Sequence, residues 1–205
     1  MNRRNFLKGS ATAIPATVAL QMLGGRSFAQ TFSSDIDVLN YALTLEYLEA
    51  EFYRQGNEAS LLSGVEDEYL QQVGADEDAH VALIGDTVSK LGGTPVSAPA
   101  VDFGESFSSR ESFLTTAHVF ENTGVSAYLG AAGFISNKAI LQAAAGIFGV
   151  EARHAAVVGS VLGLKGEGGV YMGNTETPLT ASEVLAAVDP FVVGPAGVAG
   201  VTATL

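Results

Sequence analysis

The sequence contains no cysteine and no tryptophan, and it is poor in basic residues. The absence of cysteine excludes disulfide bonds, thiolate metal sites and a cysteine nucleophile. Only 10 Lys and Arg residues stand against 22 Asp and Glu residues, so the formal net charge is −12. A chain of this charge repels polyanions, which argues against nucleic acids and anionic membranes as partners.

Apolar side chains, in contrast, are abundant. They make up 47% of the 205 residues, whereas charged residues make up 16%. This composition does not fit a disordered acidic chain, because such chains have too little apolar surface to bury. The length fits one large domain with a sizeable hydrophobic core.

The first 29 residues have the pattern of an export signal. Arg3 and Arg4 precede the apolar and basic residues 6–8, and a weakly apolar run over residues 11–23 leads to a small-x-small sequence at 27–29. This order is typical of a secretory signal, and the paired arginines resemble the twin-arginine type. The apolar run, about 13 residues long, is too short to span a bilayer. We therefore expect cleavage after residue 29, export to the periplasm or another extracytoplasmic compartment, and no stable membrane insertion afterwards.

Removal of this signal makes the chain more acidic. It leaves 6 basic residues against 22 acidic ones, a balance of −16. The resemblance to twin-arginine signals also implies a protein that folds before export, often with a metal already bound. This resemblance therefore favours a metal-binding protein.

The apolar periodicity of the remaining chain predicts four long helices. The expected ranges are 35–55, 66–91, 109–135 and 138–162. Candidate N-terminal caps precede them, namely Ser34, a Ser63–Glu66 capping box, a Ser108–Glu111 capping box and Asn137. The first and third connections are short and the second is long, which is the pattern of a four-helix bundle with one long crossover.

A different composition follows the fourth helix. Residues 164–205 are predicted to form a Gly-rich segment, a short helix over about 181–188 with a Thr180–Glu183 capping box, and an apolar tail without charged side chains. The expected organisation is thus a signal over 1–29, an all-α four-helix bundle over 30–163 and this extension.

Two of the three histidines belong to a repeated motif. His80 and His154 each follow a glutamate by three residues, Glu77 and Glu151, and each pair lies near the middle of a predicted helix. Residues three apart share one helix face, and both pairs are in register with the apolar face of their helix. The pattern predicts two Glu-x-x-His pairs that point into the bundle.

The other two long helices each offer an inward glutamate. Glu46 and Glu121 are each followed seven residues later by a tyrosine, Tyr53 and Tyr128, and a Glu-x-x-His pair comes about thirty residues after each. Glu49 is the alternative to Glu46 as a ligand. The tyrosines are interpreted either as hydrogen-bond donors or redox-active phenols beside a metal site, or as core aromatics. Four buried carboxylates are costly unless cations balance them, and two divalent metal ions would do so.

Three further polar residues are assigned other roles. His118 is expected to be structural or to support a ligand, and Asp76 and Asp78, which flank Glu77, are expected to face water.

Together these motifs resemble the ferritin-like di-metal carboxylate proteins over about residues 35–163. That family uses one glutamate from each of two helices and a Glu-x-x-His pair from each of the other two. The resemblance implies that Glu46 and Glu121 would be terminal carboxylate ligands. It also implies that Glu77 and Glu151 would bridge the metals, and that His80 and His154 would each bind one metal. The twin-arginine start and the run over residues 45–53 are similar to an exported bacterial branch, some members of which are described as desiccation-related.

Carboxylate and imidazole ligands suit iron, manganese or zinc. We expect two divalent metal ions, with iron favoured, in a di-iron oxidoreductase of the ferroxidase or peroxidase type that uses O2 or H2O2 and protects against oxidative stress. One alternative is a di-manganese, catalase-like centre that removes peroxide. The other is a non-catalytic stress or scaffold protein that keeps metals for stability. The sequence leaves the substrate open, and it is compatible with a homo-oligomer.

Overall fold

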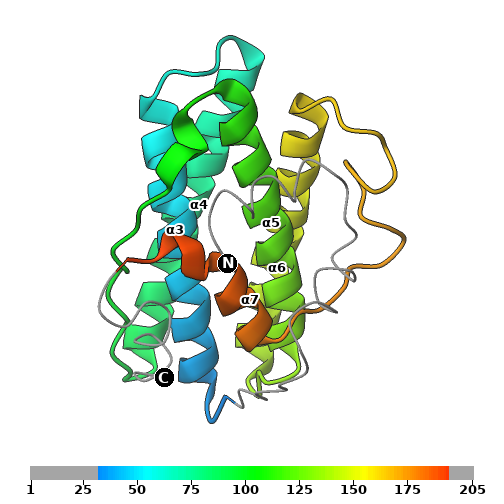
Figure 1. Cartoon of the computed structure of the whole chain (residues 1–205). Helices are drawn as coiled ribbons and strands as arrows, with labels where there is room; N and C mark the ends of the chain where they lie inside the picture. The colour runs from blue at the N-terminus through cyan, green and yellow to red at the C-terminus, as the bar shows by residue number, and fades with distance from the viewer. Residues whose placement is uncertain (1–31, 194–205) are drawn as a thin grey trace.

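The computed structural model describes residues 32–193 and confirms the all-α bundle. Its long helices are α3 (Asp35–Glu58), α4 (Val65–Lys90), α5 (Arg110–Ala132) and α6 (Lys138–Val161). Figure 1 shows α3 and α4 as one antiparallel pair and α5 and α6 as another, packed side by side. The export signal predicted over 1–29 and the end of the apolar tail lie outside the described residues.

The predicted crossover joins the two pairs. It leaves α4 after Lys90, runs along the outside of the bundle and enters α5 through the short 3-10 helix η1 (Gly104–Phe107). The crossover returns the chain to the end of the bundle where α4 began, so that α5 runs in the direction of α4. Among the described residues, no helix combines the length and the apolarity that a membrane crossing requires.

Three of the predicted helix caps are confirmed. The side chains of Ser34 and Asn137 accept backbone N–H groups of the first turns of α3 and α6. Thr180 and Glu183 form the reciprocal capping box of α7 (Ala181–Val188).

The other two predicted capping boxes are wrong. Gly64, with a φ of 62°, takes the N-cap position of α4, so Ser63 lies one residue too early to cap the helix. Glu66 instead binds the guanidinium of Arg110 at 2.7 Å. At α5 the capping box is formed by Ser109 and Ser112.

Helix ends also differ slightly from the prediction. Helix α5 ends at Ala132 rather than at 135, because the N–H of Phe134 already bonds in a tight turn to the carbonyl oxygen of Ala131. Helix α3 continues to Glu58, where Arg54 holds the last turn through ion pairs with Glu51 and Glu58.

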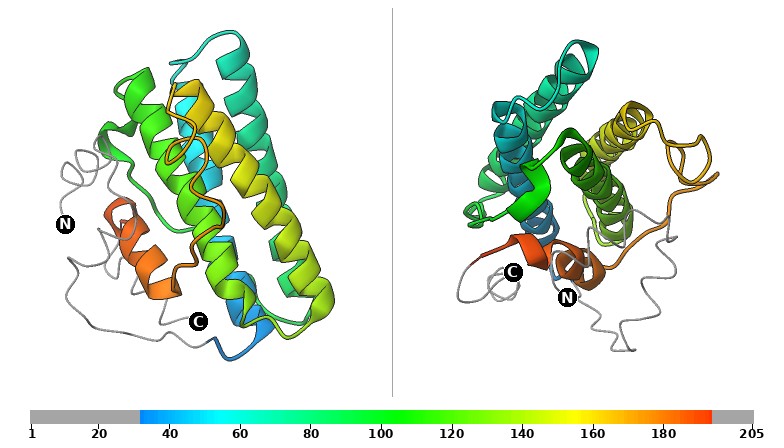
Figure 2. Two further views of the ribbon diagram at one scale, coloured as in Figure 1. Left: turned by 90° about the vertical axis from the view of Figure 1, so that its right-hand side faces the viewer. Right: turned by 45° about the horizontal axis from the view of Figure 1, so that its top comes forward.

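The extension packs on one side of the bundle. Helix α7 lies across α3 and α5, and Figure 2 shows it on the side away from α4 and α6. Its apolar residues join a cluster of phenylalanines from α3, α5 and the crossover, which includes Phe52, Phe103 and Phe120. The N–H of Val193 bonds to the carbonyl oxygen of Ala100, so the last described residue of the extension is held against the crossover.

One glycine permits this close packing. A Cβ atom on Gly130 of α5 would lie 1.8 Å from the carbonyl oxygen of Leu179, the residue that leads into α7. The extension therefore closes the α3–α5 side of the bundle, and α4 and α6 are left to form the opposite side.

Candidate metal centre

The structure brings together all six residues that the sequence analysis named as candidate ligands. Each long helix contributes from its middle turns, where the residues of the apolar face point into the bundle. The four glutamates have 0% exposure, and the two histidines keep 7% and 5%. The six residues are Glu46 from α3, Glu77 and His80 from α4, Glu121 from α5, and Glu151 and His154 from α6.

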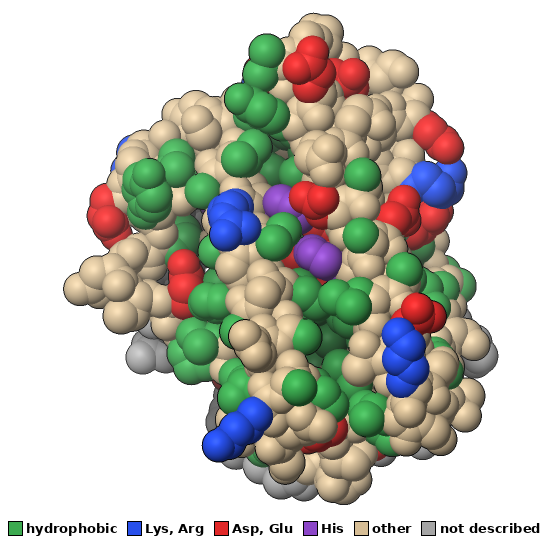
Figure 3. Space-filling model, turned by 180° about the vertical axis from the view of Figure 1, so that it is seen from behind, with side chains coloured by type: hydrophobic (Ala, Val, Ile, Leu, Met, Phe, Trp, Pro, Cys, Tyr) green, Lys and Arg blue, Asp and Glu red, His purple; other side chains and the backbone are tan. Residues whose placement is uncertain are grey.

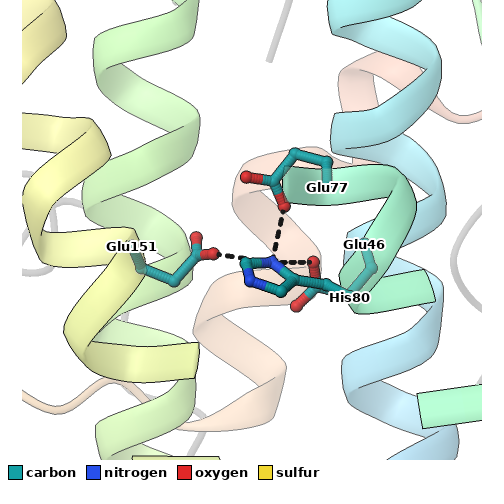
Figure 4. Close-up of side chains that lie close together, drawn as sticks. All are labelled: Glu46, Glu77, His80 and Glu151. Atoms are coloured by element: carbon teal, nitrogen blue, oxygen red, sulfur yellow. Dashed lines mark hydrogen bonds and ion pairs between the residues drawn. The ribbon is translucent and has the colours of Figure 1, made fainter. Parts of the chain in front are cut away.

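One group of potential ligands surrounds His80. Its Nδ1 atom lies 3.2 Å from Oε2 of Glu46, 3.1 Å from Oε2 of Glu77 and 3.4 Å from Oε1 of Glu151. Figure 4 shows the three carboxylates converging on this ring nitrogen from three helices. One ligand atom of each of the four residues lies within 4.8 Å of all the others, so the group could hold a metal ion.

A second group surrounds His154. Its Nδ1 atom lies 2.9 Å from Oε1 of Glu77 and 3.3 Å from Oε2 of Glu121, and Glu151 completes the set. Glu77 and Glu151 belong to both groups. If each group held one ion, Glu77 and Glu151 could therefore bind both ions.

The spacing of the potential ligand atoms suits metal binding better than hydrogen bonding among themselves. Many of them are buried without any hydrogen bond, although they lie close together: Nδ1 of His154, one oxygen each of Glu46, Glu77 and Glu121, and both oxygens of Glu151. The 2.9 Å approach of Nδ1 of His154 to Glu77 thus lacks hydrogen-bond alignment. Ligands that bind one ion at about 2.0 to 2.2 Å lie roughly 3 to 3.5 Å apart, which is the spacing observed.

Burial dominates the protonation of three of the glutamates. It raises the pKa of Glu46 to about 8 and also raises the pKa values of Glu121 and Glu151, because the charged form loses its hydration. Neighbouring carboxylates raise these pKa values further.

The histidines respond in the opposite direction. Burial alone would lower their pKa values, but the surrounding carboxylates raise that of His80 to about 12 and that of His154 to about 11. At Glu77, burial would raise the pKa, but the contacts with His154 and His80 outweigh it and lower the pKa to about 2. Protons thus supply the positive charge of the metal-free cluster, and metal binding would release them.

Two tyrosines cross between the halves of the site. The hydroxyl of Tyr53 on α3 donates to Oε1 of Glu121 on α5, and the hydroxyl of Tyr128 on α5 donates to Oε1 of Glu46 on α3. The glutamate–tyrosine repeat of the sequence is therefore also a repeat of contacts. The tyrosine of each helix pair orients the glutamate of the other pair. Both tyrosines are also core aromatics, so the two interpretations of them are compatible.

Glu49 is a fifth buried glutamate. It is 4% exposed, and burial, reinforced by the charges of Glu151 and Glu121, raises its pKa well above the usual range. Glu46 belongs to a ligand group and Glu49 does not, in agreement with the preference for Glu46.

Gly124 provides space beside Glu49. A Cβ atom on Gly124 would lie 2.5 Å from Oε2 of Glu151 and 3.4 Å from Oε1 of Glu49. The sequence analysis missed this residue, although a signal was present. Gly124 follows Glu121 by three residues, just as Glu49 follows Glu46, so the two halves of the repeat differ at this position.

The expectation that Asp76 faces only water is wrong. Its Oδ2 atom lies 3.1 Å from Nε2 of His154, although its side chain is 37% exposed. Helices α4 and α6 are neighbours, and Asp76 lies on the side of α4 that faces α6. When the Nε2–H group of His154 donates a hydrogen bond to this carboxylate, Nδ1 carries no proton and can bind a metal. Asp78 is exposed, as expected.

Replacement of Asp76 by alanine is expected to weaken metal binding by about 10- to 100-fold, because His154 would lose the partner that fixes its tautomer and ring orientation. Asp78→Ala, on the exposed side of the same helix turn, is the matched control. Competition with a chromophoric chelator measures both affinities. Equal affinities for the two variants would show that Asp76 does not orient His154.

His118 has a structural contact. Its Nε2 atom lies 2.8 Å from the carbonyl oxygen of Gly169, so it holds the segment after α6 against α5. Burial lowers its pKa, which keeps the ring neutral near pH 7.

The chain matches the model of a known protein family. The model of the ferritin-like domain family matches residues 34–164, which includes all four long helices and all six residues of the cluster. A search of curated proteins found no match for the chain.

Proposed function

Because the chain belongs to the ferritin-like domain family, we propose that it binds two divalent metal ions inside its bundle and uses them to oxidise ferrous iron with O2 or H2O2. The observation that carries this proposal is the pair of overlapping ligand groups, which share Glu77 and Glu151. Two dications would neutralise the four carboxylates and would replace the protons that balance the cluster in the metal-free protein.

Each group of the cluster has a defined part in the proposal. Glu77 and Glu151 would be shared by the two ions, Glu46 and Glu121 would hold one ion each, and the Nδ1 atoms of His80 and His154 would complete the two sites. This donor set suits iron, and the bound metals would supply the electron transfer to O2 or peroxide.

The surrounding residues hold the ligands in place. Tyr53 and Tyr128 orient the terminal carboxylates by hydrogen bonds, and Asp76 orients His154. The apolar residues of the four helices exclude water from the carboxylates, which strengthens their attraction for cations.

The charge of the protein favours the approach of Fe2+. The net charge is −12, and Figure 3 shows acidic side chains beside histidines on the face opposite α7. A negative potential raises the local concentration of cations at such a face.

The test follows ferric absorbance after Fe2+ is added in air to metal-free protein. We expect Glu77→Ala and His154→Ala to reduce the oxidation rate to that of Fe2+ in buffer alone, because each removes a metal ligand. Glu58→Ala, an exposed acid at the end of α3, should oxidise iron like the parent. If the two ligand variants oxidise iron as fast as the parent, the cluster is not responsible.

Elemental analysis of natively exported protein identifies the physiological metal. Iron supports the proposal. Manganese together with O2 release from H2O2 would replace it with a catalase-like function. Bound metal without turnover in either assay would favour a non-catalytic stress or scaffold protein.

A further inference from the structure

The two ligand groups of the candidate metal centre have matching donors. Each combines the shared Glu77 and Glu151 with one further glutamate and one histidine. The rings of His80 and His154 lie close together, with their centroids 6.3 Å apart. Each unshared glutamate also accepts a hydrogen bond from a tyrosine hydroxyl. A difference between the two metal positions therefore depends chiefly on the residues around the ligands.

The second ring nitrogen of His154 has a carboxylate partner. Oδ2 of Asp76 lies 3.1 Å from Nε2 of His154, and Oδ1 of Asp76 accepts a hydrogen bond of 2.8 Å from the side-chain amide of Gln72. The carboxylate is thus held in place by its own helix. A carboxylate in this position fixes the orientation of a ligating histidine and makes its other nitrogen a stronger ligand.

The second ring nitrogen of His80 has no such partner among the described residues, because the polar contacts of this ring all involve Nδ1. Asp76 precedes His80 by four residues on α4, and Val150 precedes His154 by four residues on α6. Val150 therefore stands where an acid would be needed to reach His80, and its side chain accepts no hydrogen bond. One turn earlier on α6, Gly146 offers no side chain that could hold such an acid.

The fifth buried glutamate adds to the same difference. After burial, the charges that raise the pKa of Glu49 most are those of Glu151 and Glu121, and that of Glu46 comes last. Glu49 thus acts more strongly on the unshared glutamate of the His154 group than on that of the other group. The corresponding position on α5 is Gly124, which carries no charge.

We propose that the two metal positions differ in affinity. The position that includes His154 and Glu121 binds the first ion and retains it. The position that includes His80 and Glu46 binds the second ion and exchanges it. Loss of a carboxylate partner from a ligating histidine weakens metal binding about 10- to 100-fold, so we expect a difference of that size. The inference rests on the proposed two-ion site, and in the proposed iron chemistry incoming Fe2+ would enter the position beside His80.

The order of binding can be followed at the histidines, because the chain has only three. The experiment adds redox-inert Zn2+ to the metal-free mature chain, labelled with 15N in its histidines, and records the imidazole 15N signals. We expect the Nδ1 signal of His154 to shift with the first equivalent of Zn2+ and that of His80 with the second. His118, whose Nε2 atom lies 2.8 Å from the carbonyl oxygen of Gly169, is the internal reference and should not change.

Removal of the partner of His154 should weaken only the first binding step. Asp76→Val gives α4 the residue that α6 has at the corresponding position, and it should lower the affinity for the first Zn2+ about 10- to 100-fold. The two steps should then have similar affinities in titration calorimetry. Asp78→Val, on the exposed side of α4, is the matched control and should change neither step.

Addition of a partner to His80 should strengthen the second binding step. Val150→Asp places a carboxylate at the position that corresponds to Asp76, so we expect the second affinity to rise about tenfold or more. When Asp76→Val is combined with it, the order should reverse, and the His80 signal should shift first. Val150→Asn supplies an uncharged acceptor if the added charge prevents folding. Ala145→Asp, on the exposed face of α6, is the control for the added charge.

Glu49 should act on the first step through its charge. Glu49→Gln keeps the shape of the side chain and should weaken the first step about three- to tenfold, and the second step less. Glu68→Gln, an exposed acid on α4, should weaken neither.

Several results would overturn the inference. These are signals of His80 and His154 that shift together, a His80 signal that shifts first in the parent, or an unchanged first step in Asp76→Val. An unchanged second step in a folded Val150→Asp or Val150→Asn variant would overturn it too. Two unequal steps without oxidation of Fe2+ would contradict the proposed function and leave the order of binding intact. Equal steps in a protein that does oxidise Fe2+ would contradict the inference alone, and failure to bind two ions would contradict both.

Discussion

Replacement of Glu151 by glutamine is expected to raise the melting temperature of the metal-free protein and to lower that of the metal-loaded protein. Both carboxylate oxygens of Glu151 are buried without a hydrogen bond, and burial raises its pKa well above the usual range. The neutral amide has the same shape without the cost of a buried charge. In the loaded protein, the same change removes a ligand shared by both metal groups.

The expected effects are large. In the metal-free protein, the gain is about 2 kcal/mol or more near pH 8, or about 5 °C for a domain of this size. The gain should vanish below about pH 4.5. Below that pH the Glu151 carboxyl is protonated in the unfolded chain as well as in the folded one, so its raised pKa no longer destabilises the folded protein. In the loaded protein, a hundredfold loss of affinity corresponds to about 2.7 kcal/mol.

Thermal unfolding with and without Zn2+, at pH 8 and at pH 4.5, measures these effects. Glu167→Gln, an exposed glutamate in the loop after α6, is the matched control and should change neither form. The same sign of effect in both forms would show that Glu151 does not bind the metals.

Substitution of Gly124 by alanine is expected to weaken metal binding by about ten- to a hundredfold, and to leave the stability of the metal-free protein within about 1 kcal/mol of the parent. The new methyl group would lie 2.5 Å from Oε2 of Glu151. The carboxylate is the end of a flexible side chain, so it can move aside when no metal holds it. Its bridging position would then be lost.

Gly146→Ala on α6 is the control for this substitution. Nothing lies within 4 Å of its added methyl group, so it should stabilise the helix by up to about 1 kcal/mol and leave metal affinity unchanged. Chelator competition and thermal unfolding measure the two quantities. Unchanged affinity in Gly124→Ala would show that the Glu151 carboxylate is free to bind from another position.

Features that depend on helical periodicity were predictable from the sequence. The spacing of Glu77 and His80 against the apolar residues of α4 places both inside the bundle, and the structure buries both. The cap at Thr180 was likewise predictable, because a capping box is a local interaction over three residues.

Features that depend on contacts between helices were not predictable. Asp76 and His154 are 78 residues apart, and nothing in the sequence fixes which side of α4 faces α6. The repeat of glutamate and tyrosine could be read from the sequence. The hydrogen bond from Tyr53 on α3 to Glu121 on α5 could not, because it joins two helices. The N-cap position of α4 falls on Gly64, whose positive φ could not be read from Ser63 and Glu66.

The position of α7 bears on how metal ions reach the candidate metal centre. Because the extension covers the α3–α5 side, while His80 and His154 keep 7% and 5% exposure on the opposite face (Figure 3), we expect metal ions to enter and leave across α4 and α6.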